Sequence, residues 1–138
     1  MTVPEEVTAP VLAGQVLAPP GSGLVLAEWT AQAATGDIPL YQAPLHSHGE
    51  DEAWYVLSGA LCVRVGDAHT QIGPGGAVIV PGGTAHTYWN PRPEPARYVL
   101  VMGARTYALI QAIHAAKDRS PQIMQRLFQE HGATLLDP

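Results

Sequence analysis

The chain has 138 residues and a formal net charge of −5, and its seven Lys and Arg residues form no cluster. This balance argues against nucleic acids and anionic membranes as partners, because both attract proteins through local positive charge. A hydrophobic content of 46% with 14% charged residues is typical of one folded domain. The single cysteine, Cys62, excludes an internal disulfide, and the acidic N-terminus does not resemble a signal peptide. A cytoplasmic protein without a membrane span is therefore expected.

Most of the chain reads as a succession of short strands. Residues 1–10 predict a polar N-terminal tail. Residues 11–103 contain short apolar runs separated by turns, which hold many of the 14 glycines and 13 prolines. About eight strands, with breaks roughly every eight to twelve residues, indicate an all-β sandwich or barrel rather than a parallel α/β fold.

Residues 104–138 differ in character from the rest. Leu109 and Ile113 follow a helical spacing, and Ser120 followed by Pro121 is typical of the start of a second helix. The segment predicts an α-helical hairpin that packs on the β domain or on a partner subunit.

The stretch LHSHGEDE, residues 45–52, concentrates the candidate chemistry of the chain. His46 and His48 are two residues apart, so on a strand both side chains point to the same face. Two imidazoles on one face suit a divalent metal if further ligands join them, whereas an isolated HXH is more often part of a polar surface turn.

Three acids follow these histidines, and the spacing selects the last one. A three-residue loop over residues 49–51 would make His48 and Glu52 the pair that closes a hairpin, with Cβ atoms ~5 Å apart. Glu50 and Asp51 would then lie in solvent and be dispensable to metal binding. The two histidines and Glu52 would converge, and this donor set suits a divalent first-row metal.

A second element follows in GGAVIVPGGTAHTYWN, residues 75–90. Pro81 ends a short apolar strand, and His86 begins the strand that returns after a tight turn. By strand parity, Tyr88 and Asn90 face the same side as His86.

Together these segments resemble the cupin family, whose two motifs are G(X)5HXH(X)3-4E(X)6G and G(X)5PXG(X)2H(X)3N. The first motif is matched at His46, His48, Glu52 and Gly59. The second is matched at Gly75, Pro81, Gly83, His86 and Asn90. The first motif departs from the family pattern at its opening glycine, where this chain has Leu40.

The resemblance implies an antiparallel jelly-roll β-barrel over residues 11–103, with one divalent transition metal (Fe, Mn, Ni, Cu or Zn) inside it. The metal ligands that it implies are His46, His48, Glu52 and His86. Four protein ligands around an octahedral ion leave two positions open for a substrate or dioxygen.

A metal-dependent, dioxygenase-like enzyme that acts on a small organic molecule is therefore expected, with Glu52 also serving as a catalytic base. Two alternatives stay open. One is a non-catalytic cupin that binds a small molecule or has an accessory role, and the other is a metal-dependent isomerase or decarboxylase.

Strand parity also predicts which side chains surround the metal. Trp54 and Val56 share the parity of Glu52 and should point into the barrel, as should Tyr88 and Asn90. These residues are candidates for a substrate pocket, although filling of the barrel core is an equally good explanation for the apolar ones. Finally, the apolar surface of residues 11–30 and of the helical hairpin predicts a homodimer.

Overall fold

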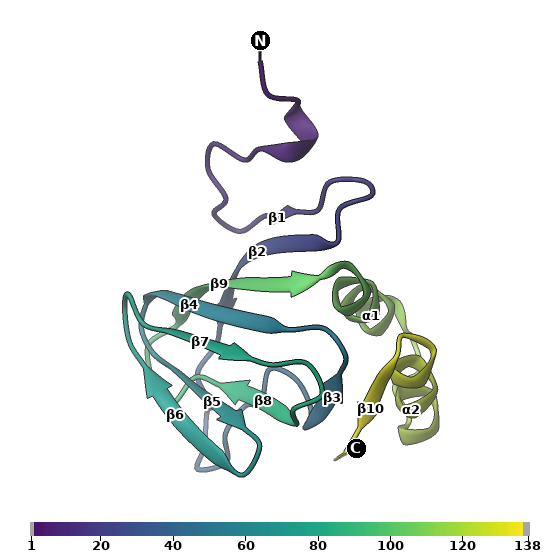
Figure 1. The fold of residues 1–138 in the computed structure, drawn as a ribbon. Helices are drawn as coiled ribbons and strands as arrows, with labels where there is room; N and C mark the ends of the chain where they lie inside the picture. Colours follow the sequence, from purple (N-terminus) through teal and green to yellow (C-terminus); the bar gives the residue numbers. More distant parts are fainter. Residues whose placement is uncertain (1, 137–138) are drawn as a thin grey trace.

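The computed structural model describes residues 2–136, which form two antiparallel five-stranded sheets and two α-helices that precede the last strand (Figure 1). The first sheet has the strand order β1-β2-β9-β4-β7 and the second β10-β3-β8-β5-β6. The strands are β1 (Val16–Leu17), β2 (Leu24–Ala31), β3 (His46–His48), β4 (Glu52–Ser58), β5 (Leu61–Val65), β6 (Ala68–Ile72), β7 (Ala77–Val80), β8 (His86–Trp89), β9 (Ala96–Gly103) and β10 (Ala133–Leu135). The helices are a short 3-10 turn, η1 (Glu5–Val7), and α1 (Ala104–Ala115) and α2 (Pro121–Glu130). The predicted all-β class with a C-terminal helical pair is confirmed.

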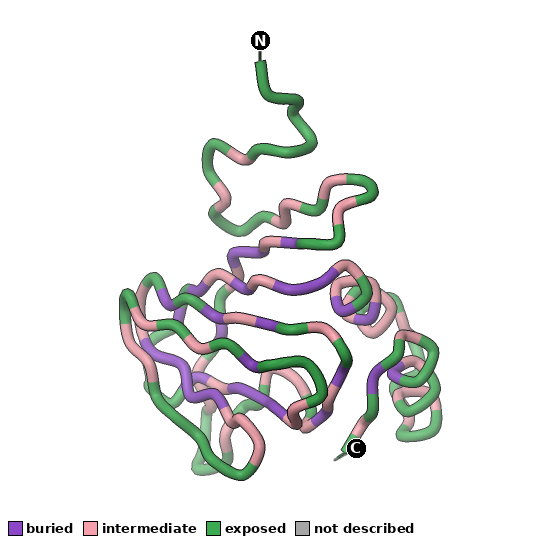
Figure 2. Tube along the Cα trace, viewed as in Figure 1, coloured by how far each residue is buried: buried purple, intermediate pink, exposed green. Residues whose placement is uncertain are grey.

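The core lies between the inner faces of the two sheets. In β9, Tyr98, Leu100 and Met102 are buried, whereas the alternate positions Val99 and Val101 are partly exposed on the outer face. The largest cluster of buried side chains also includes Trp54 and Val56 of β4 and Leu61 and Val63 of β5. Figure 2 shows this alternation of buried and exposed residues along the strands.

The predicted hairpin between His48 and Glu52 is wrong. Strand β3 belongs to the second sheet and β4 to the first, so His48 pairs with Ala133 and Glu52 pairs with Val80. Residues 49–51 form a corner between the sheets, and the chain after β7 packs tightly against this corner. The Asp51 side chain accepts a hydrogen bond from the Gly82 N–H (2.7 Å).

Beyond the barrel, α1 packs its Tyr107 and Ile110 against the main core. Leu109, Phe128 and Ala133 form a second, smaller core between the two helices and β10. Strand β10 was not predicted from the sequence, and it lies beside β3 as the outermost strand of the second sheet (Figure 1).

The N-terminal segment before β1 extends away from the barrel and is mostly exposed (Figures 1 and 2). Among residues 2–136, no helix has the length and apolar character needed to cross a lipid bilayer.

Candidate metal centre

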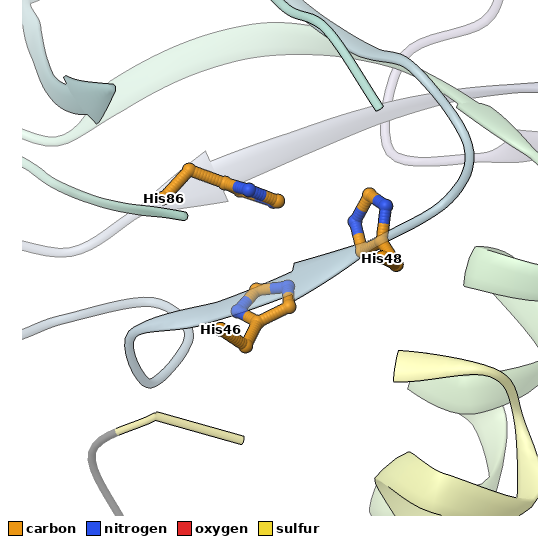
Figure 3. Close-up of side chains that lie close together, drawn as sticks. All are labelled: His46, His48 and His86. Carbon is orange, nitrogen blue, oxygen red and sulfur yellow. The ribbon is translucent and has the colours of Figure 1, made fainter. Parts of the chain in front are cut away.

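Three histidines from two adjacent strands converge inside the barrel (Figure 3). His46 of β3 and His86 of β8 are directly paired across the sheet, and His48 lies two residues further along β3. All three side chains are buried, and each offers one ring nitrogen within 4.8 Å of the other two.

One nitrogen of each imidazole forms a hydrogen bond with a backbone carbonyl group. The Nδ1 atoms donate hydrogen bonds to carbonyl oxygens, which can only accept. His46 donates to the carbonyl oxygen of Pro44 (2.6 Å). His48 donates to that of Glu50 (2.8 Å), and His86 donates to that of Thr84 (2.8 Å). Since Nδ1 carries the proton, the Nε2 lone pair of each neutral ring is available, which is the arrangement that metal-binding histidines commonly have.

Glu52 lies within reach of this cluster. Its Oε2 is 3.1 Å from His86 Nε2 and 3.8 Å from His48 Nε2, and the carboxyl group is buried. Burial would raise the pKa of Glu52, but the adjacent His48 and His86 outweigh it and lower the pKa to about 2. The carboxylate is therefore ionised at neutral pH.

The histidines differ in their affinity for protons. Burial, reinforced by the neighbouring His86, lowers the pKa of His46 to about 4, so this ring is neutral at pH 7. For His48, burial opposes protonation, but the Glu52 carboxylate outweighs burial and raises the pKa.

The donor set fits a divalent metal. His48 Nε2 is buried and has no hydrogen-bond partner among residues 2–136, which is costly unless a ligand or metal satisfies the atom. Three imidazole nitrogens and one carboxylate are the donors that divalent first-row metals bind. His46, His48, His86 and Glu52 would hold such an ion.

A cavity of about 350 Å³ opens beside this centre. His46 and Glu52 line it on the metal side, and Tyr88 and Tyr98 line its floor with their hydroxyl oxygens 2.8 Å apart. Burial raises the pKa of Tyr88 and raises that of Tyr98 to about 12, so both hydroxyls stay protonated at neutral pH. Helix α1 forms one wall of the cavity.

The four residues predicted for a substrate pocket have different environments. Tyr88 lines the cavity. Trp54 and Val56 point into the barrel but are fully buried in its core, and neither lines the cavity. Asn90 is buried, and its amide donates to the carbonyl oxygens of Ala31 and Glu94. Asn90 therefore stabilises the loop after β8.

Several residues that line the cavity were not identified from the sequence. Tyr98 and Leu100 belong to β9, and Leu109, Ile110 and Ile113 belong to α1. The parity of β9 identifies Tyr98 as an inward-facing residue, but no local signal indicates that β9 adjoins β4 or that α1 closes the barrel.

The side chains of Glu50 and Asp51 were expected to lie free in solvent, but both accept hydrogen bonds. The Glu50 carboxylate accepts hydrogen bonds from the Thr106 N–H and hydroxyl, both at 2.8 Å, in the first turn of α1. Asp51 is exposed, but it is bonded to Gly82. Both acids hold the corner around the metal centre, and neither side chain belongs to the cluster of metal donors.

An antiparallel double-stranded barrel with inward-facing histidines is the architecture of the cupin superfamily. The cupin-domain family matches residues 39–102 of this chain, a segment that contains both predicted motifs and all four candidate ligands. The chain thus carries a cupin domain, and the resemblance found in the sequence is confirmed.

The relatives support the fold without defining a substrate. An uncharacterized protein of Streptomyces coelicolor is 42% identical over 41 residues, which are 30% of this chain and 39% of that protein. A crystal structure of the protein TT1209 from Thermus thermophilus is 27% identical, with a TM-score of 0.51 over 59% of this chain and 72% of that one. An uncharacterized double-stranded β-helix protein from Klebsiella pneumoniae is 23% identical, with a TM-score of 0.53 over 72% of this chain and 84% of that one.

Proposed function

We propose that this protein is a metal-dependent, dioxygenase-like enzyme that acts on a small organic molecule. Its metal is one divalent transition ion held by His46, His48, His86 and Glu52. The observation that carries this proposal is the convergence of three buried imidazoles, of which that of His48 has an Nε2 atom without a hydrogen-bond partner in the described part of the chain.

The residues around the centre have separate roles in this proposal. The backbone acceptors fix the imidazole orientations and keep the Nε2 atoms directed inward. Glu52 lines the cavity, so its carboxylate is placed to contact a bound molecule, and the proposed role of this residue is that of a base. When bound, the metal would supply Lewis acidity and redox chemistry. The apolar side chains of α1 line the same space.

Metal analysis of the purified protein tests the proposal. We expect about one divalent transition ion per chain and its loss in the His86→Ala variant, because a missing ligand weakens the site. His69→Ala, which removes an exposed histidine of β6, is the matched control and should keep the metal. Oxygen uptake with a panel of diols and catechols then tests the dioxygenase assignment. A wild-type protein that neither carries nor takes up metal would refute the proposal.

We also propose that the protein is a cytoplasmic homodimer. The single cysteine is consistent with a reducing compartment. Dimerisation is supported by an apolar patch on the outer face of the first sheet.

A further inference from the structure

We propose that the cavity beside the metal centre recognises a neutral, largely apolar molecule that carries a hydrogen-bond-accepting oxygen. The hydroxyl pair of Tyr88 and Tyr98 would bind this oxygen. This inference rests on the proposed function, because the same cavity is lined by the candidate metal ligands His46 and Glu52.

A count of donors supports the role of the tyrosine pair. The two hydroxyl oxygens are 2.8 Å apart, and neither makes another hydrogen bond to residues 2–136. Only one hydroxyl can donate in this bond, so one O–H remains without an acceptor. The ring of Trp54 packs 5.2 Å from that of Tyr88, but the indole offers only an N–H donor and cannot accept. An acceptor oxygen on a ligand would satisfy the remaining hydroxyl.

The remaining surface of the cavity is mainly apolar. Trp29 and Leu100 contribute from the first sheet, and Leu109, Ile110 and Ile113 contribute from α1. Apolar walls with a few converging polar groups are typical of sites for small organic ligands. The body of the ligand is therefore expected to be hydrocarbon.

Away from the metal ligands, the side chains around the cavity disfavour phosphorylated ligands. None of its lining residues within the described chain is Lys or Arg, and the acidic Glu52 is one of them. At a distance from the metal ligands, a phosphate group would lose its hydration without gaining a Lys or Arg partner. Helix α1 contributes one ionisable side chain to the lining, His114, and no Lys or Arg.

The cavity volume limits the size of the ligand. A cavity of about 150 Å³ is sufficient for one benzene ring, and this cavity holds about 350 Å³. A substituted monocyclic compound or an aliphatic molecule of similar size is therefore expected.

Two probe molecules of nearly equal shape distinguish the contribution of a hydrogen bond to the ligand oxygen from that of burial of the hydrocarbon body. Acetophenone has a carbonyl oxygen where α-methylstyrene has a methylene group. Isothermal titration of the metal-loaded protein should show that acetophenone binds roughly three- to tenfold more tightly, which is the effect of one hydrogen bond. With the metal-free protein, phenyl phosphate should not compete with either probe.

The decisive variant is the double substitution Tyr88→Phe/Tyr98→Phe, because removal of one hydroxyl would leave the other free to donate. It should abolish the preference for acetophenone while binding of α-methylstyrene and metal content stay unchanged, which also shows that the cavity is intact. Tyr55→Phe, at an exposed tyrosine of β4, is the matched control and should keep the preference.

Three results would overturn the inference: binding of neither neutral probe, competition by phenyl phosphate in the metal-free protein, or a preference for acetophenone that survives the double substitution. Failure of the proposed function is distinct from these results. A wild-type protein that takes up no metal but still prefers acetophenone would refute the metal-dependent function and uphold the recognition by the tyrosine pair.

Discussion

Three consecutive acids in this chain perform three different tasks. Glu50 accepts hydrogen bonds from the first turn of α1, Asp51 accepts one from the Gly82 N–H, and Glu52 points into the barrel toward the histidines. Each side chain lies in a different environment because the backbone turns from one sheet to the other at this point. A carboxylate side chain therefore has a structural role at the first two positions and a candidate role as a metal ligand at the third.

Substitution of these acids should separate their roles. Glu52→Gln keeps the shape of the side chain but removes its charge, so we expect metal affinity to fall by at least ~10–100-fold, the loss seen when partners of metal ligands are removed. Asp51→Asn should leave metal affinity within about twofold of wild type, since its side chain lies outside the donor cluster. Competition with a fluorescent chelator would measure both values. Equal losses in the two variants would contradict the assignment.

Glu50 should stabilise the protein through α1. Its carboxylate satisfies donors in the first helical turn, so Glu50→Ala should lower the free energy of unfolding by about 1–2 kcal/mol. Glu6→Ala, at an exposed acid of η1, is the control and should change stability by less than about 0.5 kcal/mol. Urea denaturation monitored by circular dichroism measures both. An unchanged midpoint for Glu50→Ala would show that this contact does not stabilise the fold.

At the scale of the elements, the C-terminal segment covers the strand that carries two candidate metal ligands. Strand β10 pairs with β3 along its whole length, and the Phe128 ring of α2 contacts that of His46 edge-on, with ring centroids 5.5 Å apart. The strand that carries two candidate ligands is thus covered by the last elements of the chain. We infer that the helical segment supports the geometry of the metal centre.

Phe128 provides the test of this support. Phe128→Ala should lower the free energy of unfolding by about 3–5 kcal/mol, because a fully buried ring is replaced by a cavity. If α2 also supports His46, metal affinity should fall in the folded variant. Phe128→Leu, which keeps most of the apolar volume, should retain both properties better. Denaturant unfolding and metal titration measure the two effects, and loss of stability without loss of metal affinity would limit Phe128 to a packing role.

The positions of the strands along the chain could be predicted more readily than the pairing of each strand with its neighbours in the sheet. Alternation of inward and outward side chains is local, so the strands that became β4, β5, β8 and β9 were visible in the sequence. The assignment of β3 and β4 to different sheets depends on pairings distant along the chain, and the short loop between them suggested a hairpin instead. Strand β10 has only three residues, Ala133–Leu135, which carry no distinct periodicity.

At the scale of the whole molecule, the first sheet has an apolar outer face. Leu26, Val101, Ala53 and Ile79 form one row across β2, β9, β4 and β7, because each is in register with the next. Tyr55 and Val99 belong to the adjacent row, which ends at Glu28, and Glu28 is paired with Arg97. A continuous apolar patch whose nearby charges are already paired suits an isologous contact with a second copy of the chain.

Charge placed on this patch should disrupt the proposed dimer. Ile79 is 68% exposed, so Ile79→Lys should fold normally but shift the protein from dimer to monomer, because the interface would bury an unpaired charge. Glu130→Lys, at an exposed position of α2, is the control and should leave the dimer intact. Sedimentation velocity at micromolar concentration distinguishes the two states. A wild-type monomer would refute the dimer, and a dimeric Ile79→Lys variant would place the interface elsewhere.

The spacing of His46, His48, Glu52 and His86 by itself determined the cupin class and the candidate ligands, because family motifs preserve the order of donors along the chain. Only the tertiary structure decided how these residues meet. Glu52 approaches His86 across the barrel, although the two lie on strands of different sheets and 34 residues apart in sequence. The cavity likewise depends on the docking of α1 and on the contact of Tyr88 with Tyr98. Such contacts arise from the packing of distant elements, and that packing leaves no local periodicity in the sequence.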